Sequence, residues 1–227
     1  MKNLFFLITI SFSTLSNAQN LKDFSIPKGY TKITEEKGDL DKDGKEETVI
    51  ILETDQKASE NKDYPEHKDF KRILYILKQD HGKLKIWKEN SILLFSSGTG
   101  FYPEYNTPPK IFIKTASLSI TQEFNTNSRH SLTYKHTFRF QNGDFYLIGA
   151  HENFADTCEF DFTYEINFST GKVIVDKDFS SCNDNEKIPE DFYKEFTHKF
   201  QYPIKMENFK IGEHKFKIPG LKEDFIF

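Results

Sequence analysis

Three aspartates at alternate positions, followed by a glycine, form the part of the chain best suited to bind an ion. The stretch GDLDKDGKEETVII spans residues 38–51, and its acids precede an abrupt run of β-branched residues. A hard cation such as Ca²⁺ takes about six to eight oxygen ligands. Side chains at alternate positions of a tightly curled loop converge on one point, and a glycine at the sixth position permits the turn. The predicted ligands are the side chains of Asp39, Asp41, Asp43 and Glu47 and the backbone carbonyl of Lys45.

The loop differs from an EF-hand in its last position and in its flanks. The final ligand of an EF-hand loop is a bidentate Glu, and the corresponding residue here, counted from Asp39, is Ile50. Residues 48–52 favour a strand instead of a helix. An alternative interpretation is an acidic turn whose side chains accept hydrogen bonds from their own backbone. Three alternating acids repel one another without a cation, so this alternative explains the spacing poorly.

The pattern D-x-D-x-D-G-x-x-E over residues 39–47 resembles the calcium loop of FG-GAP and VCBS-type repeats, in which the loop leads directly into a β-strand. The resemblance implies Ca²⁺ bound as a structural clip. The sequence holds no second copy of the pattern, so the propeller of repeat proteins is not implied. The chain also resembles exported bacterial proteins with a single loop of this kind, through SSGTGFYPE at 96–104 and QNGDFYLIG at 141–149. That wider resemblance implies no particular activity.

Two histidines and a tyrosine form a second candidate cluster. Asn142-Gly143 lies between alternating runs, which is the strongest short-range signal for a β-hairpin. In the register set by a two-residue turn, Tyr134 faces His151, and His136 lies diagonally beside His151. Diagonal neighbours are about 7–8 Å apart, so two imidazoles can share an ion or a proton. No third ligand is evident, and two histidines on a partly exposed sheet face are the favoured interpretation.

The two cysteines of the chain are predicted to form a disulfide. Cys158 and Cys182 flank a hairpin whose first strand alternates between aromatic and polar residues. If residues 169–171 form a three-residue turn, the cysteines face each other at the open end, within disulfide range. This register places Asp176 and Asp178 on the apolar face, so we expect the second strand to end or bend before them. Buried free thiols are the alternative, and the absence of a Cys-x-x-Cys motif argues against a redox catalyst.

The first 18 residues have the pattern of a secretory signal. Lys2 is followed by a short apolar stretch, and Ser16-Asn17-Ala18 fits a cleavage site. The stretch is shorter than the ~20 residues that span a bilayer, and we expect no transmembrane segment after cleavage. Export to the periplasm, the cell surface or the medium is predicted, with residues 19–227 forming one domain. The net charge of −4 provides no basic footprint for nucleic acid.

The remaining elements are predicted to be consecutive hairpins. The 24 Phe and 10 Tyr residues indicate an aromatic core, which suits pleated sheets. Residues 72–87 should form a hairpin around a three-residue turn at 80–82, and residues 110–124 one long strand that turns back at 125–128. The charged segment 55–70 is expected to be an exposed loop. Aromatic residues at helical spacing after Pro189 predict one short amphipathic helix. The expected fold is therefore mostly β, with antiparallel sheets and one short helix in the C-terminal half.

Three functional hypotheses follow from these features. The first is a non-enzymatic, calcium-stabilised exported domain that binds an unknown protein or glycan. The second is an exported hydrolase or lyase, which would use Tyr134, His136 and His151; the sequence holds no nucleophile elbow, zinc-protease motif or complete phosphate loop. The third is an outer-membrane-associated protein, suggested by the terminal Phe225 and Phe227. Its Lys-rich alternation argues against an apolar lipid-facing band.

Overall fold

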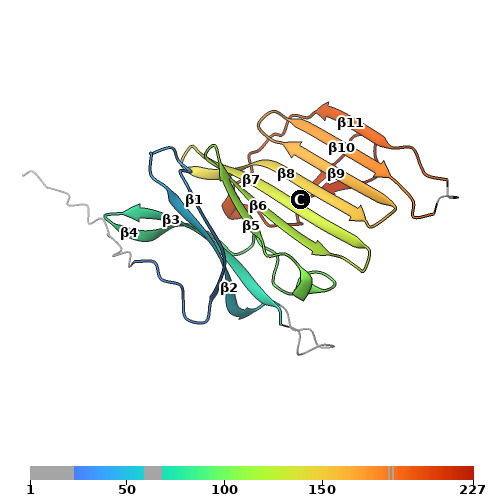
Figure 1. Ribbon diagram of the computed structural model, residues 1–227. Coiled ribbons are helices and arrows are strands. Elements are labelled where there is room, and N and C mark those ends of the chain that lie inside the picture. Colours follow the sequence, from blue (N-terminus) through green and yellow to red (C-terminus); the bar gives the residue numbers. More distant parts are fainter. Residues whose placement is uncertain (1–22, 59–67, 184, 186) are drawn as a thin grey trace, which may run out of the picture.

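The computed structural model contains two antiparallel sheets and one short hairpin (Figure 1). It describes residues 23–58, 68–183, 185 and 187–227, so the predicted signal segment 1–18 lies outside the described residues. The first sheet has the order β1 (Thr31–Gly38), β2 (Glu47–Lys57), β3 (Phe70–Asp80) and β4 (Lys83–Asn90). The second has the order β11 (Phe192–Thr197), β10 (Lys172–Phe179), β9 (Phe160–Asn167), β8 (Asp144–Asp156), β7 (His130–Gln141), β6 (Ser117–Asn125) and β5 (Lys110–Lys114). The short hairpin is β12 (Lys215–Lys217) with β13 (Asp224–Ile226), and the 3-10 helices are η1 (Pro103–Tyr105) and η2 (Met206–Asn208).

The mostly-β architecture of consecutive hairpins is confirmed. Within both large sheets each strand pairs with its neighbours in the chain, as tight turns between alternating runs dictate. Asn142 and Gly143 have φ values of 51° and 83°, the left-handed pair of a type I′ turn. His81 and Gly82 form the same kind of turn, with φ values of 51° and 79°. Asp80 therefore pairs with Lys83, and the loop has two residues instead of the predicted three.

Two segments have strand boundaries that differ from the prediction. Residues 110–124 are divided between β5 and β6 by a two-residue turn at Thr115 and Ala116, where φ is 52° and 55°. A β-branched residue rarely adopts this conformation, so the sequence offers no turn signal here. Strands also take both ends of the predicted loop 55–70, because β2 extends to Lys57 and β3 begins at Phe70. Residues 59–67 lie outside the described residues.

The predicted amphipathic helix after Pro189 is wrong, because residues 192–197 form the edge strand β11. Phe192 and Phe196 are four residues apart, a spacing that places both on one face of a helix and also on one face of a strand. The alternation decides between the two: Phe192, Lys194 and Phe196 are half-buried, and the residues between them are exposed. Pairing with β10 over the whole length of β11 provides the hydrogen bonds that a helix would otherwise make.

The β9–β10 hairpin is shifted by one residue from the predicted register. Asn167 pairs with Lys172 across a four-residue loop, and the Asn167 side chain accepts hydrogen bonds from the amides of Ser169 and Thr170 at 3.0 and 3.1 Å. A one-residue shift moves every side chain of a strand to the other face. Asp176 and Asp178 therefore lie on the solvent side, paired with Thr163 and Asp161, and β10 continues to Phe179.

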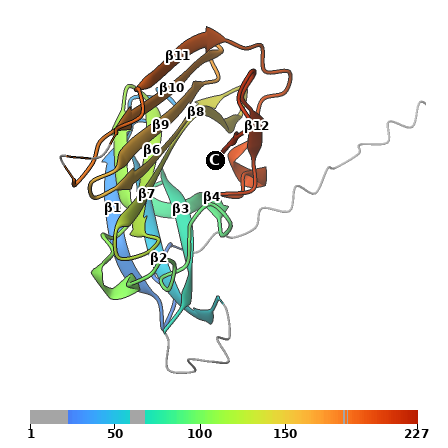
Figure 2. The ribbon, with the colours of Figure 1, turned by 90° about the vertical axis from the view of Figure 1, so that its right-hand side faces the viewer.

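The main core lies between the inner faces of the two large sheets. Trp87 of β4 contacts Phe140 and Phe145 of the seven-stranded sheet, with ring centroids 4.8 and 5.2 Å apart. The C-terminal segment adds Phe209, Phe225 and Phe227 to the same core, and Figure 2 shows this segment (red) beside the inner face of the seven-stranded sheet. Among the described residues, no helix is long and apolar enough to cross a membrane.

Strand β2 is buried on both of its faces. Val49 and Ile51 belong to the main core, whereas Ile50 and Leu52 belong to a second cluster on the other face of the sheet. Phe24 and neighbouring residues of the N-terminal segment pack against this second cluster. Burial on both faces accounts for the uninterrupted apolar run that follows the aspartate loop. The loop thus leads into one of the most buried strands of the protein.

Candidate metal centre

The loop between β1 and β2 is curled by hydrogen bonds from its own backbone to its acidic side chains. The amide of Gly44 donates to Asp39 Oδ2 at 3.0 Å, and the amide of Lys45 donates to Asp43 Oδ1 at 2.9 Å. Lys42 and Gly44 have φ values of 64° and 83°, and these left-handed residues tighten the curl. Short acids adopt such turns readily because they reach the amides that follow them. Gly44 therefore lies where the backbone turns with a positive φ, as its place in the sequence predicts.

The three aspartate side chains converge as the spacing predicts. One carboxylate oxygen from each of Asp39, Asp41 and Asp43 lies within 4.8 Å of the others. Two oxygens that coordinate the same Ca²⁺ from opposite sides are about 4.6–5.2 Å apart, twice the usual bond length. The separation is therefore compatible with one shared ion. The Lys45 carbonyl is predicted as a further ligand, and the structure places the Lys45 amide on Asp43.

Glu47 carries a buried carboxylate at the start of β2. Its side chain has 0% exposure, and its Oε2 accepts a hydrogen bond from the Leu40 amide at 2.8 Å. Its Oε1 accepts no hydrogen bond from any described residue, and the same is true of the buried Asp39 Oδ1. Burial raises the pKa of Glu47, and the nearby charges of Asp41 and Asp43 raise it further. A buried acceptor without a donor is uncommon in folded proteins, so these two oxygens are candidate ligands for a cation.

Lys78 of β3 supplies a positive charge at the centre of the cluster. Its Nζ forms an ion pair with Asp41, lies 3.0 Å from Asp43 Oδ2 and lies 3.8 Å from Glu47 Oε1. The hydrogen bond to Asp41 raises the pKa of Lys78, and the hydrogen bond from Lys78 lowers the pKa of Asp43. The ammonium also lies 4.9 Å from the centroid of the Trp87 ring. Without a metal ion, Lys78 is the counter-ion that holds the acids together.

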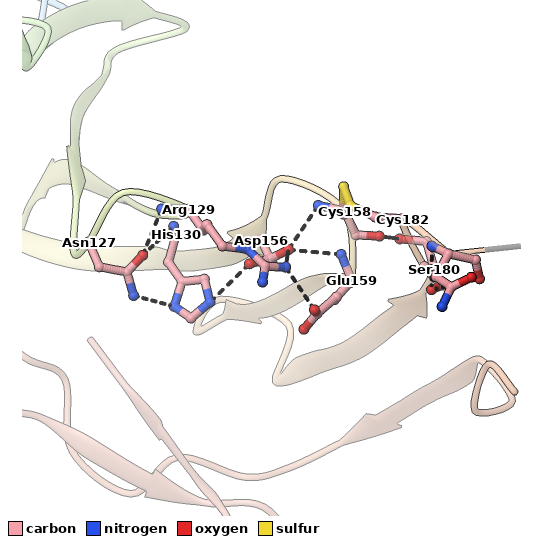
Figure 3. A network of polar contacts seen from close by, with 10 residues as sticks. Asn127, Arg129, His130, Asp156, Cys158, Glu159, Ser180 and Cys182 are labelled. Atoms are coloured by element: carbon pink, nitrogen blue, oxygen red, sulfur yellow. Dashed lines mark hydrogen bonds and ion pairs between the residues drawn. A yellow bond between two sulfur atoms is a disulfide. The ribbon is translucent and has the colours of Figure 1, made fainter. Parts of the chain in front are cut away.

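A second polar network, which the sequence did not reveal, surrounds Asp156 at the end of β8 (Figure 3). The fully buried Asp156 side chain accepts hydrogen bonds from Arg129 at 2.7 Å and from the amides of Cys158 and Glu159 at 2.8 and 2.9 Å. Burial opposes its ionisation, but these hydrogen bonds outweigh burial and lower the pKa of Asp156 to about 2. His130 Nε2 lies 3.0 Å from the second carboxylate oxygen. The network therefore ties the β6–β7 turn to the start of the cysteine hairpin.

The geometry of His130 indicates a structural role. Its Nδ1 lies 3.0 Å from Asn127 Nδ2, so both ring nitrogens have partners (Figure 3). Its ring is packed against Phe154, with the ring centroids 5.2 Å apart. The side chain therefore links the β6–β7 turn to the end of β8.

The predicted disulfide is confirmed, and it lies next to this network. Cys158 and Cys182 are bonded, with their Cα atoms 5.2 Å apart, just beyond the paired ends of β9 and β10. The carbonyl of Cys158 accepts a hydrogen bond from the Ser180 hydroxyl, and the Ser180 amide donates to the Glu159 carbonyl at 2.8 Å. The cysteines thus meet although the hairpin register differs by one residue from the predicted one.

The predicted juxtaposition of Tyr134, His136 and His151 is wrong. The register shifts at Phe138, which pairs with Leu147 while Thr137 pairs with Gly149, so Ile148 is an extra residue in β8. Tyr134 consequently pairs with Glu152 and His136 with Ala150, and His151 points to the other face beside Glu165, 3.0 Å away. His136 is fully buried against Phe209, and burial lowers the pKa of His136 to about 3. These two histidines cannot share an ion.

Of the predicted side-chain ligands, Asp39, Asp41 and Asp43 have oxygens close enough together to share one cation, and Glu47 lies outside this group. Glu47 is linked to the group through Lys78, whose ammonium lies 3.0 Å from Asp43 and 3.8 Å from Glu47. Comparison of the chain with protein-family models, with curated proteins and with solved structures finds no match.

Proposed function

We propose that this protein is an exported, non-enzymatic binding domain whose fold is stabilised by Ca²⁺ in the β1–β2 loop. The observation that carries the calcium site is the convergence of three aspartate oxygens within 4.8 Å of one another. A hard cation prefers such an all-oxygen set. Because Glu47 is the first residue of β2, an ion bound here would fasten the start of a strand that is buried on both faces.

The ammonium of Lys78 would have to leave when the ion binds. Its Nζ touches Asp41 and Asp43, which are two of the proposed ligands. Displacement of an internal counter-ion costs part of the binding free energy, so the affinity should be weak, about 10⁻⁴ to 10⁻³ M as in other extracellular modules. The Lys78 side chain is 28% exposed, so we expect it to turn towards solvent when the ion binds.

Thermal unfolding with and without Ca²⁺ tests the site. At a concentration ten times the dissociation constant, the ion should add about 1.4 kcal/mol to the free energy of unfolding. For a chain of this size that corresponds to a rise in Tm of roughly 3–6 °C. The same rise should be absent in the Asp41→Asn/Asp43→Asn variant and larger in Lys78→Met at equal Ca²⁺, because the competitor is removed.

A matched variant controls for the loss of negative charge. Glu36 and Glu46 are exposed acids near the loop, and Glu36→Gln/Glu46→Gln should retain the full response to Ca²⁺. NaCl at the same ionic strength as the added calcium salt should leave the midpoint of thermal unfolding unchanged. If wild-type protein and Asp41→Asn/Asp43→Asn respond identically to millimolar Ca²⁺, the calcium site is refuted and Lys78 is the permanent cation of the loop.

Two further observations support export and a binding role. A disulfide is typical of oxidising compartments, in line with the signal pattern of residues 1–18. His136 is sealed in the core, where it cannot reach a substrate, and His130 lies between Asn127 and the buried Asp156. An unknown protein or glycan remains the proposed partner. Release of the mature protein into periplasmic or culture fractions is the measurement that checks export.

A further inference from the structure

The outer face of the seven-stranded sheet is free of other elements of the described chain. Figures 1 and 2 show the C-terminal segment on the opposite side of this sheet. The outer positions of β5–β9 are mostly Ser, Thr, Asn and charged residues, in contrast to the aromatic inner face. One end of this polar face has a distinct charge.

Four cationic side chains mark that end of the outer face, on β5 and β7. In the observed register Lys110 shares a row with Lys135, and Lys114 shares a row with Arg139, each pair with one β6 residue between its members. Strand spacing and rise place the four Cα atoms at the corners of a rectangle of about 10 by 13 Å. None of the four forms an ion pair with a described residue, although the protein has a net charge of −4. Arg139 donates a hydrogen bond to Ser117 Oγ at 3.3 Å.

Hydroxyl groups and one aromatic ring fill the area between the four cations. Ser119 and Thr137 lie on the central row, and their hydroxyl oxygens are 2.9 Å apart. Phe112 occupies the same row on β5, and 61% of it is exposed. An exposed ring at the edge of a polar sheet offers an apolar surface without a partner in the described chain. We name this set the β5–β7 patch, and it consists of Lys110, Phe112, Lys114, Ser119, Lys135, Thr137 and Arg139.

The patch continues into a depression of about 530 Å³ on β8–β10. Gly149, which follows the bulged Ile148, lines this depression and contributes no side chain to it, and bulges often re-aim side chains next to binding sites. A Cβ at Gly149 would make only ordinary contacts, the closest at 3.6 Å to Thr137. Glu165 lines the depression and lies 3.0 Å from His151, and the neighbouring Glu195 lies 2.9 Å from Lys172. Asp161, Asp176 and Asp178 lie farther along β9 and β10 on the same face. The depression therefore adds hydrogen-bonding groups beside the patch, and the acids lie on its side away from β5.

We propose that the β5–β7 patch and the adjoining depression bind an acidic oligosaccharide, that is, a chain of sugars bearing carboxylate groups. Four unpaired cations complement the carboxylates, the Ser and Thr hydroxyls match sugar hydroxyls, and Phe112 can stack on the apolar face of a sugar ring. A nucleic acid or an anionic membrane would instead favour uniform positive charge, and Glu165 and Glu195 interrupt it here. The inference rests on the proposed binding role of the domain and does not require the calcium site in the β1–β2 loop.

The test is fluorescence polarisation with a labelled hexamer of galacturonate, measured in EGTA so that Ca²⁺ does not contribute. Wild-type protein should bind the hexamer and ignore a neutral glucose hexamer of equal length. Lys135→Glu/Arg139→Glu should weaken binding at least about tenfold, and Phe112→Ala should weaken it roughly fivefold. Gly149→Leu should weaken binding by filling the depression, and its thermal unfolding shows whether the fold is intact.

A second pair of lysines provides the matched control. Lys57 and Lys71 are exposed residues of the four-stranded sheet without ion pairs to described residues, and Lys57→Glu/Lys71→Glu makes the same change in net charge. This control should bind like the wild type. Equal weakening by both double variants would overturn the proposal, and so would absence of binding to the galacturonate hexamer. Binding of single-stranded DNA or of phosphatidylserine vesicles as tight as that of the hexamer would also overturn it. A normal Ca²⁺ response in unfolding together with no hexamer binding would reject the sugar site alone.

Discussion

Removal of the Cys158–Cys182 bond should lower the stability of the whole domain by an amount that follows from its place in the chain. The bond joins residues separated by 24 positions. Closing a loop of this length removes about 11.6 cal/mol/K of entropy from the unfolded chain, or about 3.5 kcal/mol at 25 °C. The folded state should change little, because the cysteines lie beyond the paired ends of β9 and β10 and the Asp156 network holds the Cys158 amide independently. We therefore expect Cys158→Ser/Cys182→Ser to fold and to be about 3.5 kcal/mol less stable.

Urea denaturation followed by fluorescence of Trp87 is the assay, because this single tryptophan lies where the two sheets meet. The midpoint should fall by about 1–2 M urea, with m near 2–3 kcal/mol/M. Wild-type protein in reducing agent should reproduce the double variant, and the variant itself should not respond to reducing agent. A midpoint within about 0.3 M of the wild type, measured without reducing agent, would refute the reasoning, since the bond would then place no constraint on the unfolded chain.

Two further predictions concern carboxylates of β8. Glu152 pairs with Tyr134 and Tyr164 on the inner face, and burial raises the pKa of Glu152 to about 7 from its ordinary 4.5. Because the pKa is higher in the folded state, the stabilising contribution of Glu152 is complete below about pH 4.5 and is lost as the pH rises to about 7. The loss amounts to about 3 kcal/mol in the free energy of unfolding. In urea titrations Glu152→Gln should therefore be more stable than wild type at pH 8 and similar to it at pH 4. Asp156 has the opposite sign, because its pKa is lowered to about 2, so its contribution is present above about pH 4 and is lost towards pH 2. Asp156→Asn should destabilise the protein at pH 7, and the difference from wild type should shrink as unfolding is measured closer to pH 2.

The parts of the fold that could be predicted from the sequence are those in which one local signal has one structural solution. Asn142-Gly143 specifies a type I′ turn because both residues tolerate positive φ. The alternating aromatic residues of β9 specify a half-buried strand. The spacing of Phe192 and Phe196 has two solutions, and the edge of β10 favoured the strand by offering unpaired hydrogen-bonding groups. That edge is a property of the assembled sheet, which no local pattern contains.

One extra residue in β8 explains most of the differences between the predicted and the observed surroundings of the histidines. Ile148 is bulged out of the β7–β8 pairing, and every pair beyond it is shifted by one. The shift separates His136 from His151 and pairs His130 with Asp156, which creates the buried network at the cysteine hairpin. The bulge has no residue signature in the sequence apart from the adjacent Gly149. Small errors in register thus have large consequences for the chemistry predicted on a sheet.

The aspartate loop shows how far a local motif can be interpreted. Its acids converge as the spacing predicts because the amides of the same loop bind them, so the necessary information is contained in residues 39–47. The Lys78 ammonium comes from β3, a strand that reaches the loop only through its pairing with β2. A loop with an internal counter-ion can remain folded without metal, so under the proposed function calcium would add to the stability of the domain instead of creating it. In that case the lysine on the neighbouring strand would set how much calcium the loop requires.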